Sequence, residues 1–431
     1  MIPARMLLEL GSMGLVFVGV WLAWKHWARV GWKCMASWYL LRLAVTAYVA
    51  FAVGKSVHFD LEGWVMHGQW MLEGHVPGID FRTPYSYGFN MLLKLCAMPN
   101  GTQFQIMLLF MLAEWLALGI LFFALRDLRD EMTAKRCVIL YLTSPLYITL
   151  SCLWAQDETL CLLALAAVLW TACRRNEWVA TIGMALVAGI ALFFTKILVV
   201  YYLAPFLLLR RWKGALAASL MFLVYLGGVK CCGINPFDFV FGRELGMLQG
   251  GSENVLDFFS SGNVWSVMRK PVPYAVSGAI CFVALSIVGI LFLPACFRRE
   301  STVRERFEIG VEWSCAWIFV FNIFYTMTFA TYILPVVPLM ALFVLDREQI
   351  RPIFLTGAMV FAGWMGVKLS EVYVRWFVSH LAPGSEGGYV CVLLQGVFLF
   401  LFSAAGLAFV LFCVRDRFAW LTRRLFPEES K

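Results

Sequence analysis

The sequence predicts an all-α, polytopic membrane protein with about 11 to 13 transmembrane helices, each of roughly 17 to 25 residues. Of its 431 residues, 61% are hydrophobic and only 14% are charged, and the mean hydropathy is +0.78. This composition excludes a soluble globular protein, in which charged residues make up about a quarter of the chain. Arginine and lysine also gather in alternate loops between the apolar runs, as they do in helical membrane proteins.

The apolar runs divide the chain into candidate spans. They begin near Leu7, Ser37, Phe104, Lys135, Glu158, Trp178, Ile197, Trp212, Tyr274, Glu308, Tyr332, Pro352 and Gly388. The first run carries Glu9 and lacks a small-residue cleavage site, so we expect it to be retained rather than removed as a signal peptide. Very short gaps at 154–158 and 195–196 predict half-helices or tightly turned pairs there.

The basic clusters set the orientation of the spans. They lie at 25–33, 126–136, 174–175, 210–213, 298–306, 347–351 and 415–424. The positive-inside rule places all of them on the cytoplasmic face, and the loops between them on the opposite face. The formal net charge of +8 is then explained by topology and by contact with membrane lipids, and no nucleic-acid partner is expected.

The chain is expected to form one transmembrane domain over residues 1–431, with extracytoplasmic loops at 58–103 and 231–273. No internal repeat or appended soluble domain interrupts it. Its 13 cysteines show no repeated Cys-x-x-Cys spacing, so we expect neither a zinc site nor a disulfide framework.

The first of these loops carries the densest polar and aromatic pattern. Asp60 and Glu62 open it, and apolar residues at near-helical spacing from Trp64 to Leu72 predict an amphipathic helix on the membrane surface. Glycine and proline at 74–78 end that helix, and a rigid turn then presents Arg82, Tyr85 and Tyr87. Aromatic rings beside carboxylates suit sugars, because the rings stack on sugar faces while the carboxylates accept from the hydroxyls.

Further polar residues fall on the same face of the membrane, each with a plainer structural alternative. They are Gln156, Asp157 and Glu158 before an apolar run, Lys196 at a span boundary, Asn263 and Trp265 in the second loop, and Tyr332 at the start of another span. An acid before a helix is often only a cap, a boundary lysine often only extends to the lipid headgroups, and Ser-Gly-Asn is often only a turn. Charges inside apolar runs are Arg42, Glu114, Glu312, Lys368 and Glu371, for which we expect structural pairing.

Taken in order, these motifs resemble the C-type glycosyltransferases (GT-C), polytopic enzymes that take a sugar from a polyprenyl-phosphate carrier. The similarity is to the polyprenol- or dolichol-phosphate-mannose-dependent mannosyltransferases. Asp60-Leu61-Glu62 is similar to their Asp-x-Asp motif, and Thr83 to Tyr87 to their tyrosine-rich turn. The sequences Gln156-Asp157, Lys196 with Pro205, Ser261 to Trp265 and Tyr332 to Pro335 follow in the family's order. Glu62 and Thr331 depart from the family pattern, which has a second aspartate and often a basic residue there.

The resemblance implies an inverting hexosyltransferase of the cell envelope, in the inner (plasma) membrane with its active site on the extracytoplasmic face. It implies a polyprenyl-phosphate monosaccharide as donor, with mannose as the favoured sugar, and a hydroxyl of a glycolipid, glycan or protein as acceptor. Asp60 is then the general base with Glu62 beside it, and Lys196 and Arg82 bind the donor phosphate. The implied substrate-binding residues are Tyr85, Tyr87, Gln156, Asp157, Asn263, Trp265 and Tyr332. No metal is required, although Asp60 and Glu62 offer two carboxylates to a divalent cation.

Two other classes compete with this interpretation. A transporter that flips lipid-linked saccharides would also combine many spans with sparse charges, but such proteins commonly have repeated halves. A glycan polymerase or ligase would act on similar substrates, but the arginine-rich outer loop usual in one is missing, since Arg243, Arg269 and Lys270 are few.

Overall fold

The structure is a computed structural model. It describes residues 31–52, 59–81, 83, 85–98, 102–142, 151, 155–174, 176–196, 198–210, 212–235, 264, 274–296, 302–325, 330–339, 394, 397–398, 400–401 and 403–415. The regular structure of these residues is helical, and one isolated bridge joins Pro77 to Phe81. The all-α prediction is therefore confirmed for the described part of the chain.

The chain divides into two compact units, which are described separately. The first unit comprises Met1–Glu244 and Leu334–Leu342, and the second comprises Leu245–Ile333 and Phe343–Lys431. The single transmembrane domain expected from the sequence stays a prediction.

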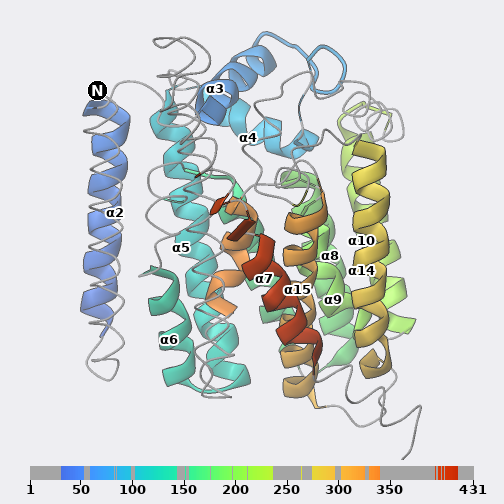
Figure 1. The fold of residues 1–431 in the computed structure, drawn as a ribbon. Helices are drawn as coiled ribbons and strands as arrows, with labels where there is room; N and C mark the ends of the chain where they lie inside the picture. The colour runs from blue at the N-terminus through green and yellow to red at the C-terminus, as the bar shows by residue number, and fades with distance from the viewer. Residues whose placement is uncertain are drawn as a thin grey trace, which may run out of the picture. The chain divides into compact units, whose positions relative to one another are not determined.

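The first unit is built from helices that pack along their lengths (Figure 1). They are α2 (Trp32–Ala52), α5 (Gln103–Leu128), α6 (Glu131–Leu142), α7 (Glu158–Ala172), α8 (Glu177–Phe194), α9 (Val199–Leu208) and α10 (Trp212–Cys231). Helix α5 buries one face against α7 and exposes Leu112 and Leu116 on the other. Helix α8 likewise exposes Ile182, Leu186 and Ile190. Apolar side chains in such outward rows are suited to contact lipid tails.

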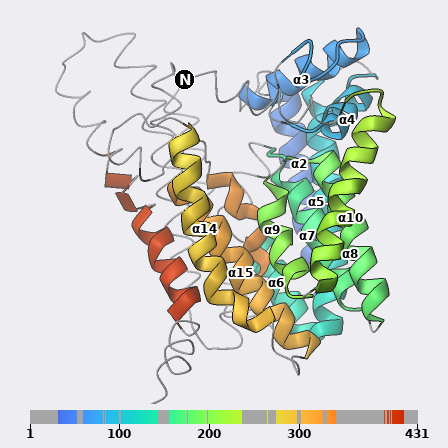
Figure 2. The same cartoon turned by 90° about the vertical axis from the view of Figure 1, so that its right-hand side faces the viewer.

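In the second unit, α14 (Tyr274–Cys296) packs against α15 (Val303–Phe324), as Figure 2 shows. Phe292 stacks on Trp313 with their ring centroids 5.5 Å apart, and the Trp317 indole N–H donates to the Leu285 carbonyl at 3.1 Å. The 3₁₀ helix Ala330–Val336 begins in this unit and ends in the first.

Four helices among the described residues are long and apolar enough to cross a bilayer. They are Gln103–Leu128, Glu177–Phe194, Val276–Pro294 and Val303–Phe324, and shorter apolar helices accompany them. The protein is thus an all-α polytopic membrane protein, as the composition predicts. The count of 11 to 13 spans stays a prediction, because long stretches of the chain lie outside the described residues, as does most of the loop at 231–273.

The first loop folds into two helices, α3 (Phe59–Leu72) and α4 (Tyr87–Ala97), which lie across the ends where α5 begins and α8 terminates (Figure 1). The predicted helix after Asp60 is confirmed. Its inner face, with Leu61 and Trp64, packs on α4 and α5. Gly74 and Gly78 follow it with φ angles of 96° and 83°, a left-handed backbone that favours glycine.

A buried ion pair joins α2 to the middle of α5. Arg42 donates to the Glu114 carboxylate, and its second terminal nitrogen donates to the Ser151 carbonyl at 3.1 Å. The hydroxyls of Tyr141 and Ser151 both donate to Glu114 Oε1 at 2.5 Å. Because Arg42 is 2% exposed and Glu114 fully buried, each charge depends on the other for neutralisation. The predicted pairing of charges within the spans is confirmed here, whereas Lys368 and Glu371 lie outside the described residues.

Replacing Arg42 with methionine is expected to destabilise the protein by about 3–5 kcal/mol, because Glu114 would remain as an uncompensated buried charge. The double variant Arg42→Met/Glu114→Gln should recover much of this loss. Unfolding of the purified protein in mixed micelles measures both. Lys213→Met is the control, since its pair with Glu177 at 2.5 Å is partly exposed and such pairs contribute about 0–1 kcal/mol. Equal losses of unfolding free energy in Arg42→Met and Lys213→Met would contradict the prediction.

Gly68→Ala is expected to loosen the first loop. A Cβ at Gly68 would lie 2.6 Å from the Leu93 carbonyl oxygen, so α3 would have to move away from α4. Gly63→Ala is a control on the same helix, where a Cβ meets nothing within 4 Å and alanine favours the helix by about 0.5–1 kcal/mol. Hydrogen exchange of residues 59–97 should become faster only in the Gly68 variant. Similar exchange in both variants would show that the close packing is not needed.

Candidate functional site

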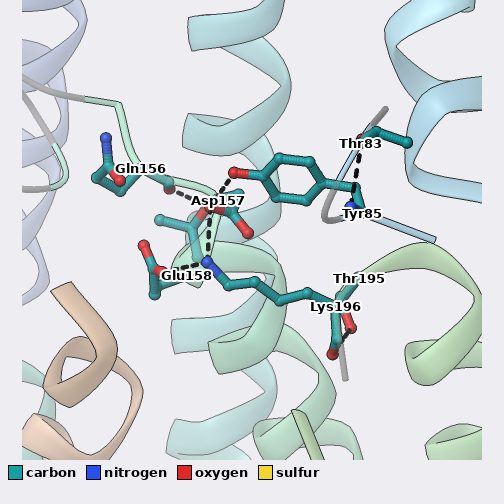
Figure 3. A network of polar contacts seen from close by, with 8 residues as sticks. Thr83, Tyr85, Gln156, Asp157, Glu158, Thr195 and Lys196 are labelled. Carbon is teal, nitrogen blue, oxygen red and sulfur yellow. Dashed lines mark hydrogen bonds and ion pairs between the residues drawn. The ribbon is translucent and has the colours of Figure 1, made fainter. Parts of the chain in front are cut away.

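Two acids and one lysine form a buried cluster next to the first loop, whose Tyr85 directs its hydroxyl toward Asp157 (Figure 3). Lys196 Nζ is 3.1 Å from Asp157 Oδ1 and 2.5 Å from Glu158 Oε1. The side chain of Lys196 is 11% exposed, that of Asp157 1% and that of Glu158 fully buried. With all three groups ionised, the cluster carries a net negative charge away from water.

The local backbone brings these groups together from two helix ends. Lys196 follows the C-terminal end of α8, while Asp157 directly precedes α7, whose first residue is Glu158. Just upstream, Ala155 has a φ angle of 48°, a left-handed conformation that is uncommon for a residue with a side chain. Asp157 occupies the cap position of α7, but its side chain makes no capping hydrogen bond. The plain alternative of a helix cap is therefore wrong for this carboxylate, which faces Lys196 instead.

The first loop is fixed to the end of α8 through Ser86. Its backbone N–H donates to the Thr195 carbonyl at 3.1 Å, and its hydroxyl lies 2.6 Å from the same oxygen and also contacts the Phe193 carbonyl. This attachment places the neighbouring Tyr85 over the ion cluster (Figure 3). The Tyr85 hydroxyl lies 3.5 Å from Asp157 Oδ1, and the centre of its ring is 5.7 Å from Lys196 Nζ.

Asp60 lies in the first turn of α3, close enough to the cluster for its charge to act on Asp157 and Tyr85. It is partly buried, and its negative charge contributes to raising the pKa values of both Asp157 and Tyr85. Glu62 is two residues further along the same helix, which turns it about 200° around the axis from Asp60. It is exposed and lines a separate hollow with residues of α2 and α5.

The electrostatics of the cluster favour a bound proton. Burial raises the pKa of Asp157, the charge of Glu158 raises it further, and Lys196 opposes both effects. Burial also raises the pKa of Tyr85 well above its ordinary value, with Asp157 adding to the shift. Tyr85 therefore stays a neutral hydrogen-bond donor, and the raised pKa of Asp157 makes this carboxyl group a proton acceptor.

Several of the residues that the sequence singled out meet at this cluster. Tyr85, Asp157 and Lys196 contact one another there, and Asp60 is near enough for its charge to act on Asp157 and Tyr85. Gln156 is buried beside them, with its carbonyl 3.4 Å from the Thr159 hydroxyl. Tyr87 lies instead near Phe193, with ring centroids 6.5 Å apart. Two further groups are not placed here: Tyr332 belongs to the second unit, 6.1 Å from the Phe321 ring, and Arg82, Asn263 and Trp265 lie outside the described residues.

Glu158 is the member of the cluster that sequence reasoning missed as a site residue. An acid in the first turn of a helix is commonly explained by its favourable interaction with the helix dipole. This explanation was sufficient for Glu158, so its contact with Lys196 was not expected from the sequence. The available signal was the run of two adjacent acids at a membrane boundary.

The described residues contain no group of three or more histidine, cysteine, aspartate or glutamate side chains placed to hold a metal ion. Asp60 and Glu62 point to different sides of α3, so the geometry does not favour a cation shared between these two carboxylates.

Asp157→Asn is expected to change how stability depends on pH. In the wild type, the pKa of Asp157 is raised above 3.8 on folding, so stability falls as the pH rises from that value through the folded-state pKa. Asparagine does not titrate and leaves Lys196 paired with Glu158, so this part of the decline should disappear. Thermal midpoints in detergent from about pH 4 to about pH 8 measure it. The exposed control Glu73→Gln should keep the wild-type profile, and an unchanged profile in Asp157→Asn would contradict the prediction.

Comparison with known proteins gives one family match. Residues 87–233 match the model of the dolichyl-phosphate-mannose-protein mannosyltransferase family. This segment runs from α4 to α10 and contains Asp157, Glu158 and Lys196, whereas Asp60 precedes it. For this segment, the match confirms the resemblance that the order of the motifs predicts. No curated protein sequence matches the chain.

Two solved structures are also similar to the chain. The crystal structure of ArnT from Cupriavidus metallidurans bound to undecaprenyl phosphate is 15% identical, with 89% of this chain and 78% of that chain covered and a TM-score of 0.47. The apo structure of the same protein is 14% identical over the same shares of both chains, with a TM-score of 0.43.

Proposed function

We propose that this protein is a GT-C-type glycosyltransferase of the inner membrane. It transfers a monosaccharide from a polyprenyl-phosphate carrier to a hydroxyl of a glycolipid, glycan or protein at the extracytoplasmic face. Mannose is the sugar that we favour. The observation that carries the proposal is the buried Lys196–Asp157–Glu158 cluster near Asp60 and Tyr85, inside a segment that matches the mannosyltransferase family model.

In this proposal Asp60 is the general base. A sugar hydroxyl is a poor nucleophile at neutral pH, and a carboxylate beside it takes its proton as the new bond forms. Asp60 is partly exposed, so its carboxylate is accessible to the acceptor hydroxyl. Attack opposite the bond to phosphate inverts the anomeric carbon, and the bond to the carrier phosphate breaks.

The leaving phosphate needs a cation, and Lys196 is the group proposed for it. Its ammonium is already held by two carboxylates, so it attracts an anion only if one of them is neutral. Asp157 is the acid that fits, because burial raises its pKa. When Asp157 carries a proton, Glu158 is the one charged partner of Lys196. The ammonium of Lys196 can then also attract the phosphate. Arg82 is the proposed second phosphate ligand, and the mechanism requires no metal.

Asp60→Asn is expected to abolish sugar transfer while the protein remains folded, since loss of a general base typically costs about 10²–10⁴-fold in rate. The assay measures radiolabel moved from polyprenyl-phosphate mannose, and in parallel from polyprenyl-phosphate glucose, into membrane lipid and glycan. The control variant is Glu73→Gln, which replaces an exposed acid just after α3. It shows whether loss of an acid in this loop by itself affects folding or the yield of active protein.

Near wild-type transfer by Asp60→Asn would remove Asp60 as the base. Absence of transfer from any donor by the wild type, together with flipping of a saccharide lipid in liposomes, would instead favour the transporter.

A further inference from the structure

A hollow lies beside α3, lined by Glu62 and by none of the residues of the ion cluster. Its volume is about 430 Å³, within the range of about 300–1,000 Å³ typical of small-molecule pockets. The lining residues come from the end of α2, from α3 and from the start of α5: Ala50, Phe51, Glu62, Val65, Thr102, Gln103 and Phe104.

Two aromatic rings form the apolar part of this hollow. Phe51 and Phe104 lie with their ring centroids 4.9 Å apart, and the Phe51 side chain is 69% exposed. The exposed Phe51 ring, packed against the partly buried Phe104 ring, suits a ligand with an apolar surface. Because α5 is long and apolar enough to span the bilayer, such a ligand can arrive from the lipid.

The polar part consists of a carboxylate, an amide and a hydroxyl. Glu62 is exposed and reaches the hollow together with Val65, one helical turn further along α3. Thr102 and Gln103 come from the start of α5, where Thr102 is held by Gln105, whose side-chain oxygen accepts from the Thr102 backbone N–H at 3.1 Å. Carboxylate and amide groups around an aromatic pair match the surface of a sugar, which has an apolar ring face and an edge of hydroxyls.

We propose that this hollow binds a sugar ring of the acceptor, namely the glycosyl headgroup of a membrane glycolipid. The inference rests on the proposed function and specifies its acceptor class. Glu62 accepts from the sugar hydroxyls, and Phe51 and Phe104 contact the ring face and the start of the lipid chain. A helix with its side chains is about 10–12 Å across, so the bound ring lies roughly that far from Asp60. The hollow therefore holds a part of the acceptor remote from the reacting hydroxyl, where binding energy positions the substrate.

The test is direct binding without turnover. The full chain in phosphatidylcholine nanodiscs is titrated with n-octyl β-D-glucopyranoside below its micelle concentration, and saturation transfer to the sugar-ring protons is measured by NMR. Empty nanodiscs correct for partition into lipid, and 1-octanol is the competitor that lacks the sugar. The variants are Glu62→Gln, Phe51→Ala and Gln69→Ala; Gln69 is exposed on the Glu62 side of α3, two turns further along, and does not line the hollow.

We expect saturable binding to the wild type that octanol displaces only weakly. Glu62→Gln should weaken it about tenfold, the scale of a lost hydrogen bond to a charged group, and Phe51→Ala several-fold. Gln69→Ala should leave it unchanged.

The proposal is overturned if the signal equals that of empty nanodiscs, if neither Glu62→Gln nor Phe51→Ala weakens it, or if octanol competes as well as the glucoside. If sugar transfer fails in the labelled-donor assay while octyl glucoside still binds, the proposed function is wrong and the sugar-binding site is supported.

Discussion

A charge removed from water must be neutralised and hydrogen-bonded, and among the described residues this constraint joins helices through the Arg42–Glu114 pair and through the Lys196 cluster. Arg42 and Glu114 bind α2 to α5; the hydroxyls of Tyr141 and Ser151 also donate to Glu114, and the Ser151 carbonyl accepts from Arg42. At the end of the helices, Lys196 binds the last residues of α8 to the first of α7 through Asp157 and Glu158. The two arrangements differ in balance. The first pairs one cation with one anion, whereas the second places two acids against one lysine.

The unbalanced cluster is the one suited to chemistry. An excess acid in a buried site holds a proton more tightly than it would in water, and burial raises the pKa of Asp157 accordingly. A protonated Asp157 would leave the charge of Lys196 partly available. Perturbed titration beside a specific charge partner is typical of functional sites. The Arg42–Glu114 pair, with one cation against one anion, fits a structural role.

The first loop decides which groups reach this cluster. Ser86 fixes it to the end of α8, and the close approach of Gly68 to the Leu93 carbonyl holds α3 on α4. Asp60 is thereby brought toward the cluster, while Glu62 is turned to the hollow beside Phe51 and Phe104. A single helix thus presents one carboxylate to the proposed reaction centre and another to the proposed acceptor site. These two roles would not be separable from the sequence Asp-Leu-Glu alone.

The sequence by itself determined the class of protein, because hydropathy and the placement of basic residues depend on composition and order and not on contacts. It also predicted the helix after Asp60 from local periodicity, and it marked Tyr85, Asp157 and Lys196 as residues of interest. Only the tertiary structure decided which of them meet. Glu158 had an ordinary explanation as a first-turn acid, and its pairing with Lys196 depends on the approach of two helix ends separated by 38 positions in the chain. The different directions of Asp60 and Glu62 likewise follow from the rotation of α3 against α4 and α5, which its buried face sets and which adjacent letters in the sequence do not reveal.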